Sequence, residues 1–339
     1  MDRKKFLGNG ALSFLALAGL ERFSADRVPK EMIVPDRLAE GDWIGVTSPA
    51  GYITAEEIDP AVSLLKQWGF RVRIGNTIGK RDFNFGGTDH ERLNDFQQML
   101  DDPGLKAVLC ARGGYGAVRI VDQLRWEQFR KFPKWIVGFS DITVFHAHLS
   151  RQVGAASIHS KMCNSFPDDW QKADQLQTAT ILSIRDALLG IPFNMQIEGS
   201  EKNRPGHAEA ILVGGNLKTI ESLSGSRSDM LTDGRILFVE DTGEYRYSVD
   251  RMFWNLKRSG KLANLAGLIV GGFRLKPDDP GEEFGRELED IVLEKVHEYA
   301  YPVCFNFPVG HQKNNFALKC GVRHKLAVYK TETRLTELT

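Results

Sequence analysis

The sequence predicts an α/β protein of two domains, because strands and helices alternate along a chain too long for one core. The chain has 339 residues, whereas a typical domain has roughly 100 to 200. From Asp42 onward, short apolar runs alternate with amphipathic runs of helical period. This alternation is typical of a parallel sheet that helices cover on both faces. It breaks between about Asn164 and Pro205, a polar stretch rich in Gly, Pro and Asn, which we interpret as the interdomain connection.

The N-terminal domain is expected to span residues 31–165. Thr54 with Glu57, and Thr88 with Glu91, have the spacing of capping boxes, which place the starts of two helices. Strands are expected at 43–48, 70–74, 107–111, in the run that ends at Gly138, and at 155–159, and helices at 54–69, 88–100, around 120–124 and after Ser140.

A connection at 166–205 and a C-terminal β/α domain at 206–339 follow. The connection holds one expected helix, at 179–189, and apolar residues at helical spacing predict a helix at 249–256 and a long one at 284–296. Strands are expected at 208–213, 235–239, 266–270, 303–307, 316–318 and 325–329.

Residues 1–30 differ in character from the rest of the chain. Basic residues at 3–5 precede an apolar stretch from Phe6 to Leu20, and Ala16-Leu17-Ala18 gives a small-x-small cleavage pattern. These features predict an export signal, hence a periplasmic protein with no membrane segment in its mature form. The alternative is a poorly ordered extension of a cytoplasmic protein, which Gly8-Asn9-Gly10 inside the apolar run favours.

Composition and charge exclude several classes of function. Basic and acidic residues both number 44, so the chain carries no net charge and a nucleic-acid partner is disfavoured. The four cysteines have no Cys-x-x-Cys spacing and are expected to be buried, and the histidines show no metal-binding motif. We therefore expect no metal and no cofactor.

Ser140 lies where an apolar strand should pass into a helix. At such a turn a hydroxyl is lifted clear of the sheet, and the first amides of the helix point free N–H groups at a ligand. The sequence therefore favours Ser140 as a nucleophile. Its alternative role is that of an N-cap, whose side chain accepts a hydrogen bond from the helix that follows.

Three further loops follow expected strands, where α/β proteins place their ligands. These loops are the glycine-rich segment 112–116, the segment with carboxylates that begins at Glu240, and the segment 308–312, which contains His311. A serine attacks only when a histidine takes its proton, and the resulting imidazolium needs a carboxylate. Each group alone has a structural alternative: a tight turn, a helix cap or a structural histidine. Together, a serine, a glutamate and a histidine follow strands in this order along the chain, and these residue types fit the needs of a serine nucleophile.

These motifs resemble the LD-carboxypeptidases, or muramoyltetrapeptide carboxypeptidases. The resemblance runs from about Asp42 to Tyr329 and rests on five ordered motifs: Arg-Gly-Gly-Tyr-Gly at 112–116, Gly-Phe-Ser-Asp-Ile-Thr at 138–143, Gly-Gly-Asn-Leu at 214–217, Leu-Phe-Val-Glu-Asp at 237–241 and Gly-His at 310–311.

The resemblance implies a serine peptidase that removes a terminal D-alanine from peptidoglycan tetrapeptides through an acyl-enzyme. It makes Ser140 the nucleophile, His311 the base and Glu240 its partner, with the amides of Gly114 and Asp141 as the oxyanion hole. It also implies a flavodoxin-like N-terminal domain, a swivelling C-terminal β/α domain and a homodimer.

Substrate contacts are expected from Arg112, Tyr115 and Asn216. Arg112 has a planar fork suited to a substrate carboxylate, with a structural ion pair as its alternative. The chain departs from the family at 159–162, where His-Ser-Lys-Met replaces a common His-Gly-Pro, and at Gln312, where a glycine is frequent.

Two other functions stay open at this point. Members of the same family cut a peptide-nucleotide antibiotic, which needs an aromatic platform for the base. A two-lobed protein that binds peptides without chemistry is the alternative of another class, and it predicts that a serine-reactive probe leaves Ser140 unlabelled.

Overall fold

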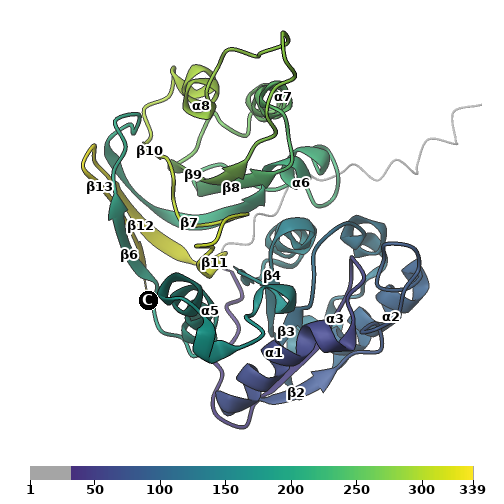
Figure 1. Ribbon diagram of the computed structural model, residues 1–339. Coiled ribbons are helices and arrows are strands. Elements are labelled where there is room, and N and C mark those ends of the chain that lie inside the picture. The colour runs from purple at the N-terminus through teal and green to yellow at the C-terminus, as the bar shows by residue number, and fades with distance from the viewer. Residues whose placement is uncertain (1–31, 339) are drawn as a thin grey trace, which may run out of the picture. The chain divides into compact units, whose positions relative to one another are not determined.

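The computed structural model describes residues 32–338, so the expected export signal lies outside the described residues. Its first sheet has the strand order β11-β5-β4-β3-β1-β2 (Figure 1). Strands β1 to β5 are parallel and follow the flavodoxin-like order 2-1-3-4-5, as the resemblance implied. The bounds are β1 Trp43–Thr47, β2 Arg71–Ile74, β3 Leu105–Cys110, β4 Trp135–Gly138 and β5 Ser157–His159.

Helices cover both faces of this sheet. Helix α1 (Ala55–Gln67) packs on one face, and α2 (Asp89–Asp101) and α4 (Thr143–His148) pack on the other. Both predicted capping boxes are present, with Thr54 and Thr88 as the N-caps. The expected helix around 120–124 is instead a pair of 3₁₀ turns, Ala117–Arg119 and Val121–Gln123, followed by the short α3 (Glu127–Lys131).

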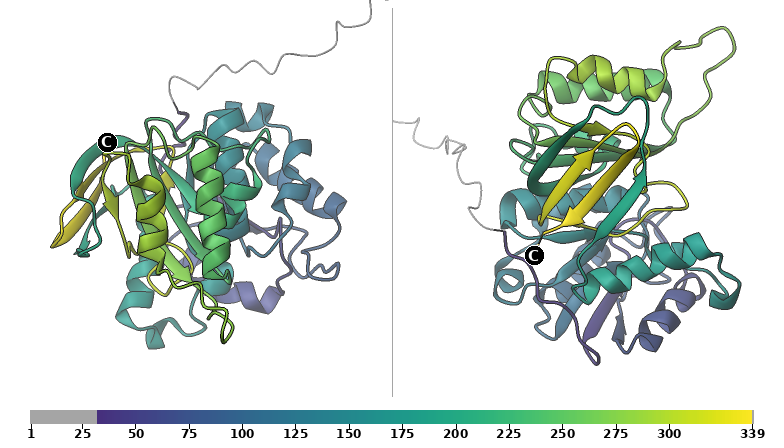
Figure 2. Two further views of the ribbon diagram at one scale, coloured as in Figure 1. Left: turned by 90° about the horizontal axis from the view of Figure 1, so that it is seen from above. Right: turned by 90° about the vertical axis from the view of Figure 1, so that its left-hand side faces the viewer.

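The second sheet has the order β10-β9-β8-β7-β12-β13-β6. Its parallel half consists of β7 (Gly206–Asn216), β8 (Ile236–Thr242), β9 (Gly267–Arg274) and β10 (Val303–Cys304), and the rest is antiparallel. The short α6 (Leu217–Ser222) follows β7, and α7 (Arg246–Arg258) and α8 (Leu288–Val296) lie side by side over one face (Figure 2). Helix α8 is shorter than the expected helix at 284–296. It begins at Leu288, so Phe284 lies outside it.

The chain passes between the two sheets three times. Helix α5 (Gln175–Leu188) packs on the first sheet, whereas β6 (Asn194–Glu198), which follows it, is an edge strand of the second. Strand β11 (Leu318–Cys320) returns to the first sheet and pairs antiparallel with β5. The chain then ends in the second sheet with β12 (Arg323–Val328) and β13 (Glu332–Glu337).

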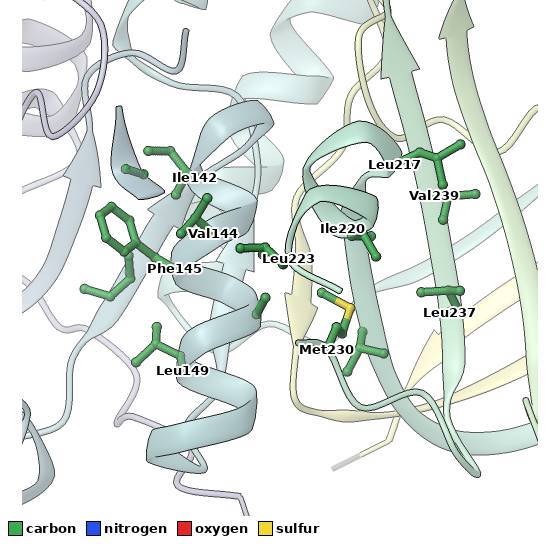
Figure 3. Close-up of a cluster of buried hydrophobic side chains, with 14 of the residues drawn as sticks. Ile142, Val144, Phe145, Leu149, Leu217, Ile220, Leu223, Met230, Leu237 and Val239 are labelled. Carbon is green, nitrogen blue, oxygen red and sulfur yellow. The ribbon is translucent and has the colours of Figure 1, made fainter. Parts of the chain in front are cut away.

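One buried apolar cluster extends over both sheets. Val144, which follows the Ser140 turn, belongs to the same buried cluster as Ile220, Leu223 and Met230 of the C-terminal half, which lie across the seam from its helix (Figure 3). Burying a side chain of this size stabilises the fold by about 1.5–3 kcal/mol. The seam therefore fixes the helix after Ser140 against the C-terminal half.

All four cysteines are buried free thiols, as predicted. Within residues 32–338, no helix is both long and apolar enough to cross a membrane.

Candidate active site

Ser140 lies in a sharp turn between β4 and α4. Its φ of +64° is in the left-handed region, which costs a residue with a side chain about 1–2 kcal/mol. A 3₁₀ turn begins at Ser140, with Phe139 as its N-cap residue and no side-chain capping hydrogen bond. The N-cap alternative is therefore wrong, because Ser140 is the first residue of the turn and not its cap. Backbone strain of this kind is typical of functional sites.

The 112–116 loop packs directly against this serine. A Cβ atom at Gly113 would lie 3.0 Å from the Cβ of Ser140 and 3.3 Å from its Oγ, so only glycine fits without displacement. The Gly113 carbonyl accepts a hydrogen bond of 2.8 Å from the Gly51 amide. The Gly114 N–H has no acceptor among residues 32–338, so it is free to donate to a ligand.

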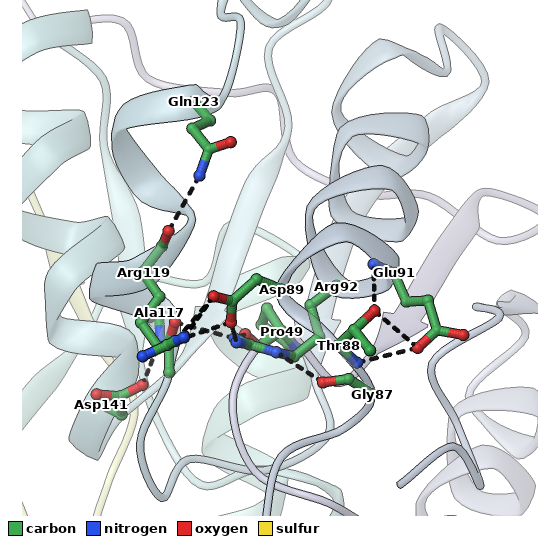
Figure 4. Close-up of polar contacts among 11 residues, drawn as sticks. Pro49, Gly87, Thr88, Asp89, Glu91, Arg92, Ala117, Arg119, Gln123 and Asp141 are labelled. Carbon is green, nitrogen blue, oxygen red and sulfur yellow. Dashed lines mark hydrogen bonds and ion pairs between the residues drawn. The ribbon is translucent and has the colours of Figure 1, made fainter. Parts of the chain in front are cut away.

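Asp141 holds the loop to the turn. Its Oδ2 accepts a 2.8 Å hydrogen bond from the Ala117 amide, and the buried Arg92 donates to the carbonyls of Gly116 at 2.9 Å and Pro49 at 2.7 Å (Figure 4). Burial raises the pKa of Asp141 to about 6, although the backbone hydrogen bonds and Arg92 oppose the shift. The side chain of Asp141 is thus structural, and its catalytic part would be played by its amide.

Glu240 and His311 form a hydrogen-bonded pair. His311 Nδ1 lies 2.6 Å from Glu240 Oε2, and the same oxygen accepts the His311 backbone N–H at 3.1 Å. The Glu240 side chain is fully buried, whereas that of His311 is 18% exposed. The carboxylate therefore fixes the imidazole and leaves Nε2 as the free nitrogen.

Close backbone contacts set the position of His311. Gly310 has φ +106°, and a Cβ there would lie 2.3 Å from the Cβ of Glu240, so no larger residue fits between the pair. The Gly310 amide donates to Asn315 Oδ1 at 2.8 Å, and the Gly272 amide donates to Val309 at 2.8 Å. Gln312, where the family often has glycine, packs its amide against Gly272.

The His311 ring reaches the serine turn through Phe139. The two ring centroids are 4.8 Å apart at 47°. Among residues 32–338, no hydrogen bond joins Ser140 to His311. Both residues thus lie in one region of the structure, without a hydrogen bond between their side chains.

The three expected substrate contacts lie in different surroundings. Arg112 is exposed and donates to the Tyr52 carbonyl at 3.1 Å. Its alternative role was a structural ion pair, but no carboxylate pairs with it among the described residues. Tyr115 is half exposed and packs against Phe85. Asn216 is buried: its side chain donates to Asp241 at 3.0 Å and accepts from Thr219, so it joins β7 to β8 and caps α6.

A pocket between the two halves opens beside His311. It measures about 480 Å³ and is lined by both halves of the chain, with Phe139, Lys161 and Ser165 from the first and Arg274 and 310–313 from the second. In the sequence, Lys161 stands out only as a departure from the family, and Arg274 and Lys313 belong to no motif that would identify them. No group of three His, Cys, Asp or Glu side chains within residues 32–338 could hold a metal ion.

Comparisons with known proteins match both halves of the chain to one family. The LD-carboxypeptidase N-terminal domain matches residues 44–160, and the LD-carboxypeptidase C-terminal domain matches 209–326. The "Probable murein peptide carboxypeptidase" of Bacillus subtilis is 32% identical over 291 residues, which cover 85% of this chain and 90% of that protein. The microcin C7 self-immunity protein MccF of Escherichia coli is 25% identical over 319 residues, covering 86% and 91%.

A solved structure shares the fold over nearly its whole length. The muramoyltetrapeptide carboxypeptidase from Oxalobacter formigenes superposes with a TM-score of 0.77 at 28% identity, covering 88% of this chain and 99% of that one. The two domain matches together span more than half of the chain, in the order in which its two sheets are built. The chain therefore belongs to the LD-carboxypeptidase family.

Proposed function

We propose that this protein is a serine LD-carboxypeptidase that removes the terminal D-alanine from peptidoglycan-derived tetrapeptides. The observation that carries the proposal is the 2.6 Å Glu240–His311 hydrogen bond, next to a serine in a strained strand-to-helix turn. The murein peptide carboxypeptidases among its relatives supply the substrate class.

The proposed reaction is acyl transfer. His311 Nε2 takes the Ser140 proton as Oγ attacks the carbonyl carbon, and Glu240 stabilises the imidazolium. The amides of Gly114 and Asp141 would hold the oxyanion, a role that the free Gly114 N–H supports. The imidazolium then gives its proton to the leaving D-alanine, and water releases the acyl group by the reverse steps. Substrate binding would close the Ser140–His311 contact.

Replacing the nucleophile tests this mechanism. Ser140→Ala should lower the rate of D-alanine release by several orders of magnitude, because the remaining site gives only modest catalysis over water. Mass spectrometry of the tetrapeptide after incubation measures the loss of one terminal D-alanine. Ser222→Ala is the matched control, since the Ser222 hydroxyl is exposed and only donates to the Thr219 carbonyl. A Ser140→Ala enzyme that keeps the wild-type rate excludes the assignment.

Hydrolysis of a peptide-nucleotide antibiotic is the second candidate, which the likeness to the microcin C7 self-immunity protein supports. That activity would require turnover of a peptide-linked nucleotide and little or no release of D-alanine from the tetrapeptide. A comparison of kcat/KM for the two substrates separates the candidates.

Assembly and location are also part of the proposal. The family resemblance supports a homodimer, and the basic and apolar residues of 2–20 support export to the periplasm. If these residues are not a signal, the protein works in the cytoplasm.

A further inference from the structure

Among the described residues, Lys161 is a cation without a partner, and it lines the pocket. Its side chain lies at the pocket beside His311, and the residue is only 9% exposed. No carboxylate pairs with its ammonium group and no acceptor binds it among residues 32–338. Burial lowers the pKa of Lys161, the neighbouring Lys313 lowers it further, and Asp174 opposes the shift. An ammonium group in partly desolvated surroundings attracts an anion more strongly than one in open water does.

The rest of the pocket wall reinforces the positive charge. Arg274 also lines the pocket and is exposed, and Lys313 adds a third cation, which pairs with Asp174. The lining residues include no carboxylate. The pocket is therefore built to receive an anion, within reach of the His311 ring that also lines it.

We propose that Lys161, with Arg274, binds a carboxylate of the peptide substrate and is a specificity-determining residue. The proposal rests on the proposed function and names the group that this pocket recognises. A tetrapeptide of the diaminopimelate type offers two such groups near the scissile bond: the carboxylate of the terminal D-alanine and the side-chain carboxylate of the diamino acid. Both have the same chemistry, so substrate variants must separate them.

The first experiment compares Lys161→Met with wild type on two tetrapeptides. One carries the free diaminopimelate side-chain carboxylate, and in the other this group is a carboxamide. Loss of a charge-assisted hydrogen bond should raise KM about 10-fold to 100-fold and leave kcat within a few-fold. A rise with the free carboxylate alone assigns the side-chain carboxylate, and a rise with both peptides assigns the terminal one. Unchanged KM on both peptides overturns the proposal.

Two further variants guard against a folding defect. Arg274→Met changes an exposed side chain, so it should fold as wild type does and still raise KM on the same peptide. Lys66→Met, on the exposed side of α1, is the charge-matched control and should leave KM unchanged. If Lys161→Met is unstable, an unchanged KM for Arg274→Met overturns the proposal.

A binding measurement separates this inference from the catalytic proposal. Calorimetry measures the affinity of the tetrapeptide for Ser140→Ala and for the Ser140→Ala, Lys161→Met double variant. A 10-fold or greater weakening in the double variant supports the carboxylate site even if the wild type releases no D-alanine, an outcome that would reject only the catalytic proposal. Equal affinities together with normal wild-type turnover reject only the carboxylate site.

Discussion

At the residue scale, the Glu240 carboxylate accepts hydrogen bonds from His311 alone among the described residues. Its Oε2 accepts both hydrogen bonds from His311, while its buried Oε1 has no hydrogen-bond partner among the described residues. A buried carboxylate in this state is under-compensated as long as the imidazole is neutral. Protonation of His311 supplies the missing positive charge. In the proposed mechanism this charge forms when His311 takes the Ser140 proton, so Glu240 would stabilise the imidazolium.

Glu240→Gln should separate this electrostatic role from binding. The amide keeps one acceptor for His311 but cannot stabilise the imidazolium, so we expect kcat to fall by about 10³-fold to 10⁴-fold with a smaller change in KM. Steady-state release of D-alanine measures both constants. The control is Glu209→Gln, an exposed carboxylate on β7 paired with Arg323. Retention of more than a tenth of wild-type kcat in Glu240→Gln would contradict the role given to Glu240.

Single residues were predicted where the local sequence carries the signal. Ser140 and His311 follow strands that the apolar runs identify and lie in a turn and a loop, as expected. Glu240 instead lies inside β8, which continues past the expected end at Val239 to Thr242. The left-handed φ of Ser140 was not predictable, because a serine before a helix is usually a cap. Lys161 could not be singled out, because the pocket that it lines is completed by residues 310–313 from the other half of the chain.

At the element scale, the segment between β10 and β11 explains how His311 reaches the serine. Strand β10 belongs to the second sheet and β11 to the first, so residues 305–317 pass from one sheet to the other. Strand β11 pairs with β5, which places Leu318 opposite His159. The sequence predicted a strand near 316–318 but not its partner, because a short apolar run does not specify the sheet that it joins.

Strand β7 contacts the serine turn through glycine. A Cβ at Gly215 would lie 2.5 Å from Thr143 Oγ1, and the same oxygen accepts the Asn216 amide at 3.0 Å. Thr143 is fully buried and β-branched, so its side chain has little freedom to move away. The small residues of Gly-Gly-Asn-Leu are thus needed for the contact between the two halves of the chain.

Gly215→Ala should therefore damage the site as well as the fold. A positive φ costs alanine about 1–2 kcal/mol, and overpacking against Thr143 adds about 1–3 kcal/mol. The displacement should also lower kcat/KM, because Thr143 lies three residues from Ser140. Gly234→Ala isolates the backbone cost, since Gly234 has φ +65° and no atom within 4 Å of the added Cβ. Denaturant midpoints and kcat/KM of the two variants make the comparison, and equal losses in both would refute the contact argument.

At the scale of the whole molecule, buried histidines couple stability to pH. Burial lowers the pKa of His146, His148 and His324 to about 4, and that of His159 well below its ordinary value. Between pH 6.5 and 4 the unfolded chain binds protons that the folded chain does not, so acidification lowers stability. Asp141 and Asp241, whose pKa burial raises to about 6, act in the opposite sense.

The balance of these groups sets the direction of the pH dependence. From pH 7 to pH 5, His146, His148 and His324 each lower the free energy of unfolding by about 2 kcal/mol. Each of the two aspartates raises it by about 1 kcal/mol. The histidines outnumber the aspartates, so the protein should lose stability over this range.

His324 gives the sharpest test, because its surroundings can accept an apolar substitute. It is fully buried, its Nδ1 donates to the Val322 carbonyl at 3.1 Å, and its Nε2 has no partner among residues 32–338. The charged groups near it, Glu337 and Lys319, pair with each other at 2.7 Å. The Val322 carbonyl also accepts from the Leu212 amide, so it keeps a partner when the ring is removed.

His324→Leu should flatten the loss of stability on acidification. The variant lacks the proton that unfolded His324 binds below pH 6.5, so its free energy of unfolding should fall by about 2 kcal/mol less than that of wild type between pH 7 and pH 5. Urea unfolding at the two pH values measures the difference, and the slope of each transition checks that the same surface unfolds in both proteins. An identical fall in both proteins would mean that His324 takes up its proton as easily in the folded chain as in the unfolded one, against the desolvation that its burial imposes.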